Sequence, residues 1–267
     1  MQNVQVVANR ARNDGWAPAS AGMPAAAKRL PELLSDAPGE DLDALTDTVA
    51  FIKDTEGRYT YANQTLVRRL GFSRREEVIG RSEAELYPEA LFSAHPKQDE
   101  RVLQGETIDN ELQVLVLPNH AARWCLTHKQ PLEVDGEIRG IVVRSQDVSI
   151  PETAGSCPTS LRRVFEYLRE HYTESVRVYA LADMVGMSMT QLDKHFRARY
   201  RLTPQQMLTR LRIDLALRML NGNDSMAAIS QACGFADQSA FTRQFRATVG
   251  MTPRSYRTTV RTAAVAG

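Results

Sequence analysis

Alternation of hydrophobic and polar positions dominates the chain between residues 41 and 149. Alternation with a period of two is typical of strands, and turn residues bound each run. The predicted strands are Val49–Lys53, Arg58–Ala62, Ile108–Leu117, Ala122–Leu132 and Glu137–Gln146. Asp135-Gly136 joins the last two and suits a tight hairpin, so we expect these strands to pair in an antiparallel sheet.

Short helices are expected between the second and third of these strands, starting near Asn63. Ser73 with Glu76, and Ser82 with Glu85, have the spacing at which a hydroxyl and a carboxylate cap a helix reciprocally. Strands and helices together predict an α+β domain.

Domain boundaries follow from where these periods start and stop. Residues 1–35 have no sustained hydrophobic period and are expected to form a disordered arm. The α+β domain is expected over residues 36–150, and a stretch with Pro, Gly and Ser over residues 151–160 predicts a linker.

The last part of the chain has helical periodicity and an internal repeat. Ala180-Leu-Ala-Asp-Met-Val-Gly186 recurs as Ala228-Ile-Ser-Gln-Ala-Cys-Gly234, 48 residues further on. Each copy predicts a short helix, a turn containing glycine and a second helix, the order of a helix-turn-helix. We therefore expect an all-α domain with two such units over residues 161–260, followed by a disordered tail over residues 261–267.

The second helix of each copy is amphipathic. In the first copy, Ser188 and Gln191 have capping-box spacing, and hydrophobic residues from Leu192 onward recur every four positions. In the second copy, Asp237 can cap the helix and Phe241 belongs to the buried stripe.

The polar faces of these helices carry side chains suited to base edges and phosphates. They are Thr190, Gln191, Lys194 and Arg197 in the first copy, and Gln238, Ser239, Thr242, Arg243 and Arg246 in the second. Asp193 is an exception, because a carboxylate repels phosphate. It is expected to pair with a neighbouring cation, and the alternative is that it accepts from a cytosine amine.

A single long helix is predicted between the two copies. Thr203 suits its N-cap, Pro204 its first position, and Gly222 follows its end at Leu220. Hydrophobic residues cover most of its circumference, which predicts burial between two subdomains. At 1.5 Å per residue the helix spans about 26 Å, so attached helices could reach major-groove faces about 34 Å apart.

Net charge distinguishes the two halves, although the whole chain carries only +1. From Leu161 onward, 16 Arg and Lys stand against 8 Asp and Glu, whereas the preceding residues have 17 against 24. A basic domain attracts the phosphate backbone of DNA, but a solvated basic face has the same composition. The polar helix faces favour DNA.

These residues resemble the DNA-binding domain of the AraC/XylS family, seven helices in which a long central helix joins two helix-turn-helix units. The resemblance extends from Leu161 to Arg257 and includes Arg210-Leu-Arg-Ile-Asp-Leu-Ala-Leu-Arg-Met-Leu220 and Thr252-Pro253-Arg-Ser-Tyr-Arg257. It implies that the nine polar-face residues named above contact DNA, with Arg197 and Arg246 as phosphate clamps. It further implies an activator of transcription whose partners are double-stranded DNA and RNA polymerase.

The α+β domain resembles a PAS sensor domain, through Val49–Asn63, Val78-Ile-Gly-Arg81 and Asp135-Gly-Glu-Ile-Arg-Gly140 with Gln146–Ser149. The resemblance implies a five-stranded antiparallel sheet whose concave face holds a small ligand or serves as a dimer surface. Candidate ligand-binding residues are Phe51, Tyr61, His95, Trp124 and Leu126.

No cofactor is expected in this domain. His95 lies near where oxygen-sensing PAS domains place their haem-binding histidine, but Pro96 follows it and the register is one residue off. The cysteine motif of flavin-binding light sensors is missing from the helical region.

An enzyme is the competing class, and DNA-repair alkyltransferases with this type of DNA-binding domain represent it best. They need a Pro-Cys-His nucleophile and clustered zinc-binding cysteines, and the sequence has neither. Cys125, Cys157 and Cys233 are widely spaced, which is typical of reduced thiols, and the five histidines show no metal-binding spacing. We expect no catalytic residue and no metal.

Two hypotheses remain open for the PAS-like domain. In the first, a small-molecule effector binds two conformations differently and thereby controls DNA binding. In the second, the domain is a dimerisation or partner-docking module without a ligand, and a second copy of the chain is its expected partner. No apolar run is long enough to span a bilayer and the N-terminus lacks a signal pattern, so a cytoplasmic location is expected.

Overall fold

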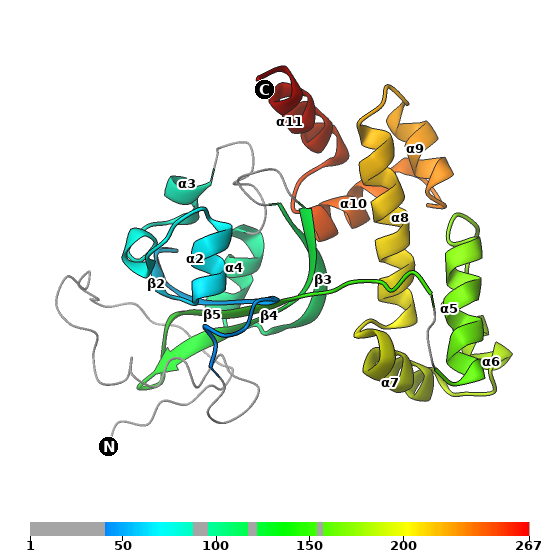
Figure 1. Cartoon of the computed structure of the whole chain (residues 1–267), viewed down its shortest axis with the longest axis horizontal. Coiled ribbons are helices and arrows are strands. Elements are labelled where there is room, and N and C mark those ends of the chain that lie inside the picture. Colours follow the sequence, from blue (N-terminus) through cyan, green and yellow to red (C-terminus); the bar gives the residue numbers. More distant parts are fainter. Residues whose placement is uncertain (1–40, 88–95, 117–121, 154–156, 267) are drawn as a thin grey trace. The chain divides into compact units, whose positions relative to one another are not determined.

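The computed structural model describes residues 41–87, 96–116, 122–153 and 157–266. The chain divides into two compact units, unit 1 over residues 1–147 and unit 2 over residues 148–267, and each is described by itself (Figure 1). The arm predicted for residues 1–35 and the candidate His95 lie outside the described residues.

Unit 1 contains a five-stranded antiparallel sheet with the strand order β2-β1-β5-β4-β3. Its strands are β1 (Thr48–Asp54), β2 (Tyr59–Ala62), β3 (Ile108–Val116), β4 (Ala122–Val134) and β5 (Glu137–Asp147). The predicted α+β fold class is confirmed. Asp135 and Gly136 have φ angles of 53° and 80°, the left-handed pair that a tight β4–β5 hairpin requires.

Short helices accompany the sheet: α2 (Gln64–Arg69), the 3₁₀ turn η2 (Arg75–Glu77), α3 (Glu83–Leu86) and α4 (Pro96–Leu103). Glu85 accepts from the backbone and hydroxyl of Ser82, as the capping-box spacing predicts. The box predicted at Ser73 and Glu76 is wrong. Glu77, one residue further on, accepts from the backbone of Ser73 and Arg74 instead.

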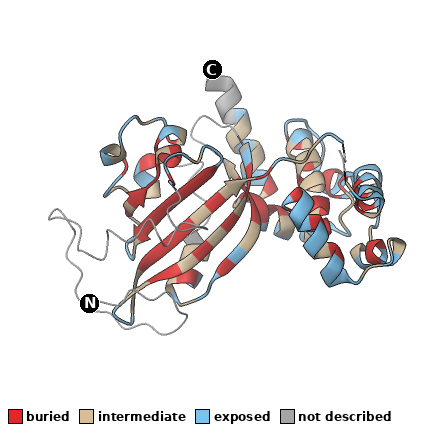
Figure 2. Ribbon diagram, turned by 60° about the horizontal axis from the view of Figure 1, so that its bottom comes forward, coloured by how far each residue is buried: buried red, intermediate tan, exposed pale blue. Residues whose placement is uncertain are grey.

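Both faces of the sheet bury hydrophobic side chains. Figure 2 shows the buried residues of the strands in red. On one face, Phe51, Tyr59 and Val143 pack with residues of α2, α3 and α4. On the other face, Ile52 and Tyr61 pack with residues that include Leu42 and Val142. β1 and β5 therefore contribute alternate residues to two separate clusters.

Seven helices make up the described part of unit 2. They are α5 (Thr159–His171), α6 (Val178–Met184), α7 (Met189–Tyr200), α8 (Pro204–Leu220), α9 (Met226–Ala232), α10 (Gln238–Val249) and α11 (Pro253–Ala266). Residues 261–266, within the segment predicted as a disordered tail, continue α11. Arg261 holds this end by donating to the carbonyl of Gly222 and to Asn223 Oδ1.

The long helix predicted between the two copies is α8. Thr203 Oγ1 accepts from the backbone N–H of Gln206, Gln206 Oε1 accepts from that of Thr203, and Pro204 is the first helical residue. Its buried residues are Pro204, Met207, Leu208, Ile213, Ala216 and Leu220. Full burial of one large apolar side chain contributes about 1.5–3 kcal/mol, so α8 is the central packing element of unit 2. Within the described ranges, no helix has the length and apolar character needed to cross a membrane.

Candidate functional site

The first recognition helix is α7, the second helix of the first helix-turn-helix unit. Its N-cap and one row of buried side chains stabilise it. Ser188 Oγ accepts from the backbone of Gln191, and Gln191 Oε1 accepts from that of Ser188, at 3.2 and 3.0 Å. Leu192, Phe196 and Tyr200 are at most 3% exposed, as predicted. Since the cap uses the amide oxygen of Gln191, its N–H groups are the part that can reach a base or phosphate.

The second recognition helix, α10, has the same construction with a different cap. Asp237 Oδ1 accepts from the backbone N–H of Ala240 at 2.7 Å, and Phe241 and Phe245 are fully buried. Thr242 donates its hydroxyl proton to the carbonyl of Gln238 at 2.8 Å, which leaves the oxygen lone pairs as its external hydrogen-bonding capacity.

The predicted DNA-binding residues occupy the outer faces of these two helices. All of them are exposed except Thr242, which is half-buried: Thr190, Gln191, Lys194, Arg197, Gln238, Ser239, Arg243 and Arg246. Among the described residues, Lys194, Arg197, Arg243 and Arg246 have no ion-pair partner. Their full charge is therefore available to phosphate or guanine.

Asp193 lies half-buried on α7 beside these cations. The ion pair predicted with a neighbouring Arg or Lys is not formed among the described residues. Of the two alternatives, acceptance of a hydrogen bond from a cytosine amine is the one that this geometry leaves open.

Arg212 of α8 contacts both the loop that follows α5 and the turn of the second helix-turn-helix unit. Its guanidinium donates to the carbonyls of Tyr172 and Glu174, after α5, at 2.7 and 2.8 Å, and lies over the ring of Phe235. Gly234 presses against the same loop, because a Cβ built there would lie 2.6 Å from the carbonyl oxygen of Thr173. Sequence reasoning missed Arg212, and the signal for it was a charged residue within an apolar helix.

Two arginines form hydrogen bonds with the residues at the start of the segment before α5. In unit 1, Arg69 binds both carboxylate oxygens of Asp147, the last residue of β5, at 2.9 and 2.8 Å. In unit 2, Arg210 of α8 donates to the carbonyl of Val148 at 2.7 Å. Two consecutive residues of the chain are thus fixed by side chains.

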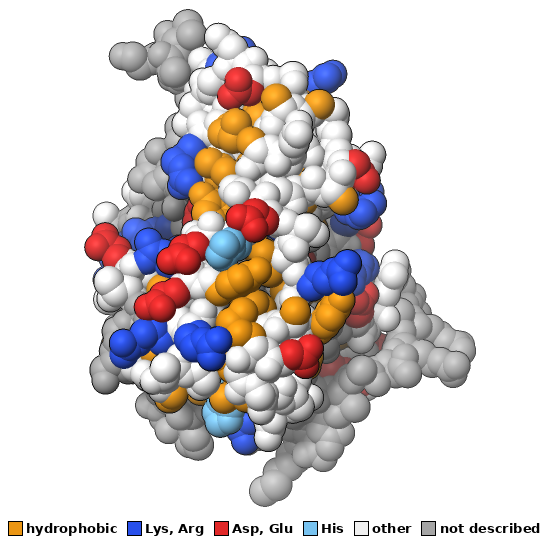
Figure 3. All heavy atoms as spheres, turned by 90° about the vertical axis from the view of Figure 1, so that its right-hand side faces the viewer, with side chains coloured by type: hydrophobic (Ala, Val, Ile, Leu, Met, Phe, Trp, Pro, Cys, Tyr) orange, Lys and Arg blue, Asp and Glu red, His pale blue; other side chains and the backbone are white. Residues whose placement is uncertain are grey.

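Figure 3 shows the face of unit 2 that carries α5 and α6, where acidic and basic side chains alternate around an apolar band. On α5, for example, Glu166 and Glu170 accompany Arg163 and Arg169. A face with both signs of charge has no net attraction for a polyanion. The candidate DNA interface is therefore the exposed surface of α7 and α10.

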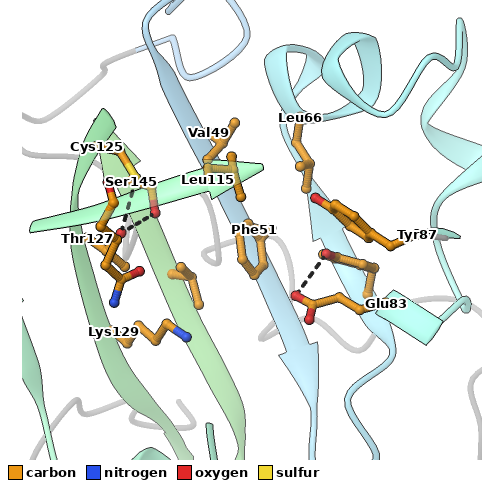
Figure 4. Close-up of a pocket in the computed structure, with 13 residues that line it drawn as sticks. Val49, Phe51, Leu66, Glu83, Tyr87, Leu115, Cys125, Thr127, Lys129 and Ser145 are labelled. Carbon is orange, nitrogen blue, oxygen red and sulfur yellow. Dashed lines mark hydrogen bonds between the residues drawn. The ribbon is translucent and has the colours of Figure 1, made fainter. Parts of the chain in front are cut away.

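Unit 1 contains a cavity of about 50 Å³ between the sheet and the helices (Figure 4). Figure 4 shows Thr127, Lys129 and Ser145 reaching into it from β4 and β5, with Glu83, Tyr87 and Leu66 opposite. The remaining lining residues are Val49, Phe51, Tyr59, Gln113, Leu115, Cys125 and Val143. The side formed by β4 and β5 therefore carries polar groups, and the rest of the lining combines apolar side chains with a few polar ones, as in many small-molecule sites.

Of the predicted ligand-binding residues within the described ranges, Phe51 alone lines this cavity. Tyr61 packs with Ile52 on the opposite face of the sheet. Trp124 and Leu126 are not lining residues either, because Cys125 and Thr127 point into the cavity and successive side chains of a strand alternate. The sequence analysis did not name Lys129 and Thr127. The available signal was that they lie at the positions of β4 that alternate with Trp124 and Leu126.

A cluster of four charged side chains closes one end of the cavity. Asp99 of α4 accepts from Lys129 at 2.7 Å and from Lys53 at 3.0 Å, and Lys53 also binds Glu83. Burial raises the pKa of Asp99, but Lys53 and Lys129 outweigh this effect and hold it below its ordinary value. Burial lowers the pKa of Lys53, and Glu83 and Asp99 outweigh it to leave a net increase. Asp99 and Lys53 are therefore charged at neutral pH.

The three cysteines are free thiols, as predicted. Burial raises the pKa of the Cys125 thiol to about 11, which makes it unreactive at neutral pH. In the part of the chain that the structure describes, no three His, Cys, Asp or Glu side chains are grouped to hold a metal ion.

Comparison with known families assigns both units. Residues 181–259 match a helix-turn-helix domain family, and residues 42–152 match a PAS fold family. The chain therefore carries a domain with the PAS fold followed by a helix-turn-helix domain.

Curated relatives include transcriptional activators named RhaS. The chain is 32% identical over 118 residues to that of Escherichia fergusonii, which covers 44% of this chain and 42% of the relative. It is 33% identical over 107 residues to that of Pectobacterium carotovorum, which covers 40% of this chain and 38% of the relative. The chain thus spans about two fifths of the length of these relatives.

Among solved structures, the DNA-binding domain of the global transcriptional factor AdpA, in complex with a target DNA, is similar to this chain. The identity is 30%, the TM-score is 0.38, and the match covers 41% of this chain and 100% of that chain.

Proposed function

From a chain that joins a PAS domain to an AraC-type helix-turn-helix domain, we propose a sequence-specific, DNA-binding transcription regulator. The proposal includes activation through RNA polymerase, because the relatives named above are transcriptional activators. It also includes a PAS domain that senses a small-molecule effector.

One observation carries the proposal of DNA binding. Within one compact unit, α7 and α10 expose cations that lack ion-pair partners among the described residues, and both helices pack against the apolar elements around α8. Rigid attachment matters because two helices can read one duplex only if their separation is fixed. Polar contacts from both helices then distinguish sequences.

Genome-wide mapping of the sites bound by the full chain identifies its DNA, and binding to the recovered site is then measured. Arg243→Ala should weaken that site by about 1–3 kcal/mol and relax its base preference, since a guanidinium can bind guanine in a bidentate manner. Arg246→Ala should weaken all duplexes alike and reduce the salt dependence by about one phosphate contact. Equal losses on every sequence for both variants would refute these separate roles.

The cavity lined by Lys129 and Thr127 supports the proposed sensing. Filling it by Val143→Phe should abolish the response of the target promoter to its effector and leave DNA binding by the same protein intact. An unaltered promoter response would instead favour the dimerisation or docking module. Ala44→Phe, outside the cavity lining, is a control for the added volume.

A further inference from the structure

The cavity of unit 1 offers hydrogen-bond donors at its polar wall. Lys129 Nζ carries three N–H groups, and among the described residues Asp99 accepts one of them. The hydroxyls of Thr127 and Ser145 lie 2.9 Å apart beside it and share a single hydrogen bond. A ligand that faces this wall needs an acceptor for Lys129, because an ammonium group has no lone pair to offer.

The four side chains that form ion pairs at the cavity balance in charge. Lys53 and Lys129 match Asp99 and Glu83, and the ammonium groups belong to residues that are 3% and 5% exposed. An anion or a cation entering the cavity would lose its hydration without meeting a surplus of opposite charge. An uncharged ligand avoids this penalty.

The volume of the cavity and its apolar lining residues limit the size and polarity of the ligand further. A volume of about 50 Å³ has room for about four water molecules, so haem and flavin exceed it. Phe51, Leu66 and Leu115 are apolar side chains that line the cavity. A compact molecule with a hydrocarbon edge matches these side chains.

We propose that this cavity binds a small, uncharged molecule that presents a carbonyl oxygen or a ring nitrogen to the ammonium group of Lys129. The inference rests on the proposed sensing function and names the ligand class of that site. Lys129 then provides orientation, and Thr127 and Ser145 provide a second contact that can donate or accept.

Three probes of similar size test the ligand class on the full chain: the neutral lactam 2-pyrrolidinone, the anion butyrate and the cation pyrrolidinium. Dissociation constants are measured by saturation-transfer NMR at neutral pH. The lactam should bind saturably, and each ion at least about tenfold more weakly, because one unmatched charge or one charged hydrogen bond is worth this factor.

Substitutions test the role of Lys129. Lys129→Met should weaken lactam binding by about tenfold or more, and Lys129→Gln should restore part of it, because an amide donates without a charge. Lys97→Met removes an exposed lysine of α4 and should change nothing. Tryptophan fluorescence verifies that each variant is folded.

Three results would overturn the proposal: tighter binding of butyrate or pyrrolidinium than of the lactam, equal lactam binding by Lys129→Met, or no binding of the lactam. The promoter response of Val143→Phe judges the sensing function separately. If the probes contradict the ligand class but Val143→Phe still abolishes the promoter response, then only the ligand class is wrong and the proposed sensing function is retained.

Discussion

The two units of the chain place charge in opposite ways. In unit 1, the side chains of Lys53 and Lys129 are buried beside a cavity and paired with carboxylates. In the described part of unit 2, the buried polar residues are uncharged, namely Thr203, Ser230 and Thr248. The difference teaches that removing one partner of an internal ion pair should destabilise unit 1, whereas unit 2 keeps its cations exposed, where the proposed function has them contact DNA.

The largest effect is expected from Asp99→Ala, which removes the carboxylate that Lys53 and Lys129 share. Removing one partner of a buried ion pair costs about 3–5 kcal/mol, and unit 1 should lose this much stability. Urea unfolding followed by fluorescence reports on unit 1 through Trp124, which is buried in β4. Glu100→Ala, at the exposed neighbouring position, is the control. An equal loss in unit 2, followed by far-UV circular dichroism, would contradict the contrast between the units.

Unit 2 should instead be sensitive to packing, and its two turn glycines provide a matched pair. Both have positive φ, but a Cβ at Gly186 meets nothing within 4 Å, whereas at Gly234 it meets the backbone of Thr173. We expect Gly186→Ala to cost about 1–2 kcal/mol and Gly234→Ala about 3 kcal/mol or more. Circular dichroism during urea unfolding measures both, and equal losses would show that the close approach to Thr173 is unimportant.

Arg212→Met tests whether the hydrogen bonds from α8 to the loop after α5 stabilise unit 2. The variant removes two hydrogen bonds to carbonyls, worth about 1–3 kcal/mol together, and retains most of the apolar stem. Arg218→Met, at an exposed position of the same helix, should have little effect. Identical unfolding midpoints for the two variants would show that Arg212 does not stabilise unit 2.

The smallest effect is the acid response of unit 1. Because Asp99 has a lowered pKa in the folded state, its stabilisation is complete above the ordinary value of 3.8 and is lost as pH falls below it. The urea midpoint seen by fluorescence should therefore decrease from about pH 4 to about pH 3. Asp99→Asn should flatten this dependence, and an unchanged slope would assign it to other carboxylates.

Local signals predicted most of the fold from the sequence. The Ser188 cap, Thr203-Pro204 and Asp135-Gly136 each depend on neighbouring residues, so their outcome could be read from the chain alone. The polar faces of α7 and α10 followed from helical periodicity in the same way.

The cavity was harder to predict, because it depends on the parity of each strand and on distant pairs. A shift of one position exchanges Leu126 for Thr127 and so moves the predicted contact to the other face of the sheet. Asp99 and Lys129 are 30 residues apart in the sequence, and no local pattern relates them.

The hydrogen bond from Arg210 to Val148 has a mechanical consequence. Arg210 lies near the middle of α8, and both recognition helices pack on the elements that this helix organises. A displacement of the peptide that follows β5 would therefore act directly on α8 and, through it, on the elements against which α7 and α10 pack.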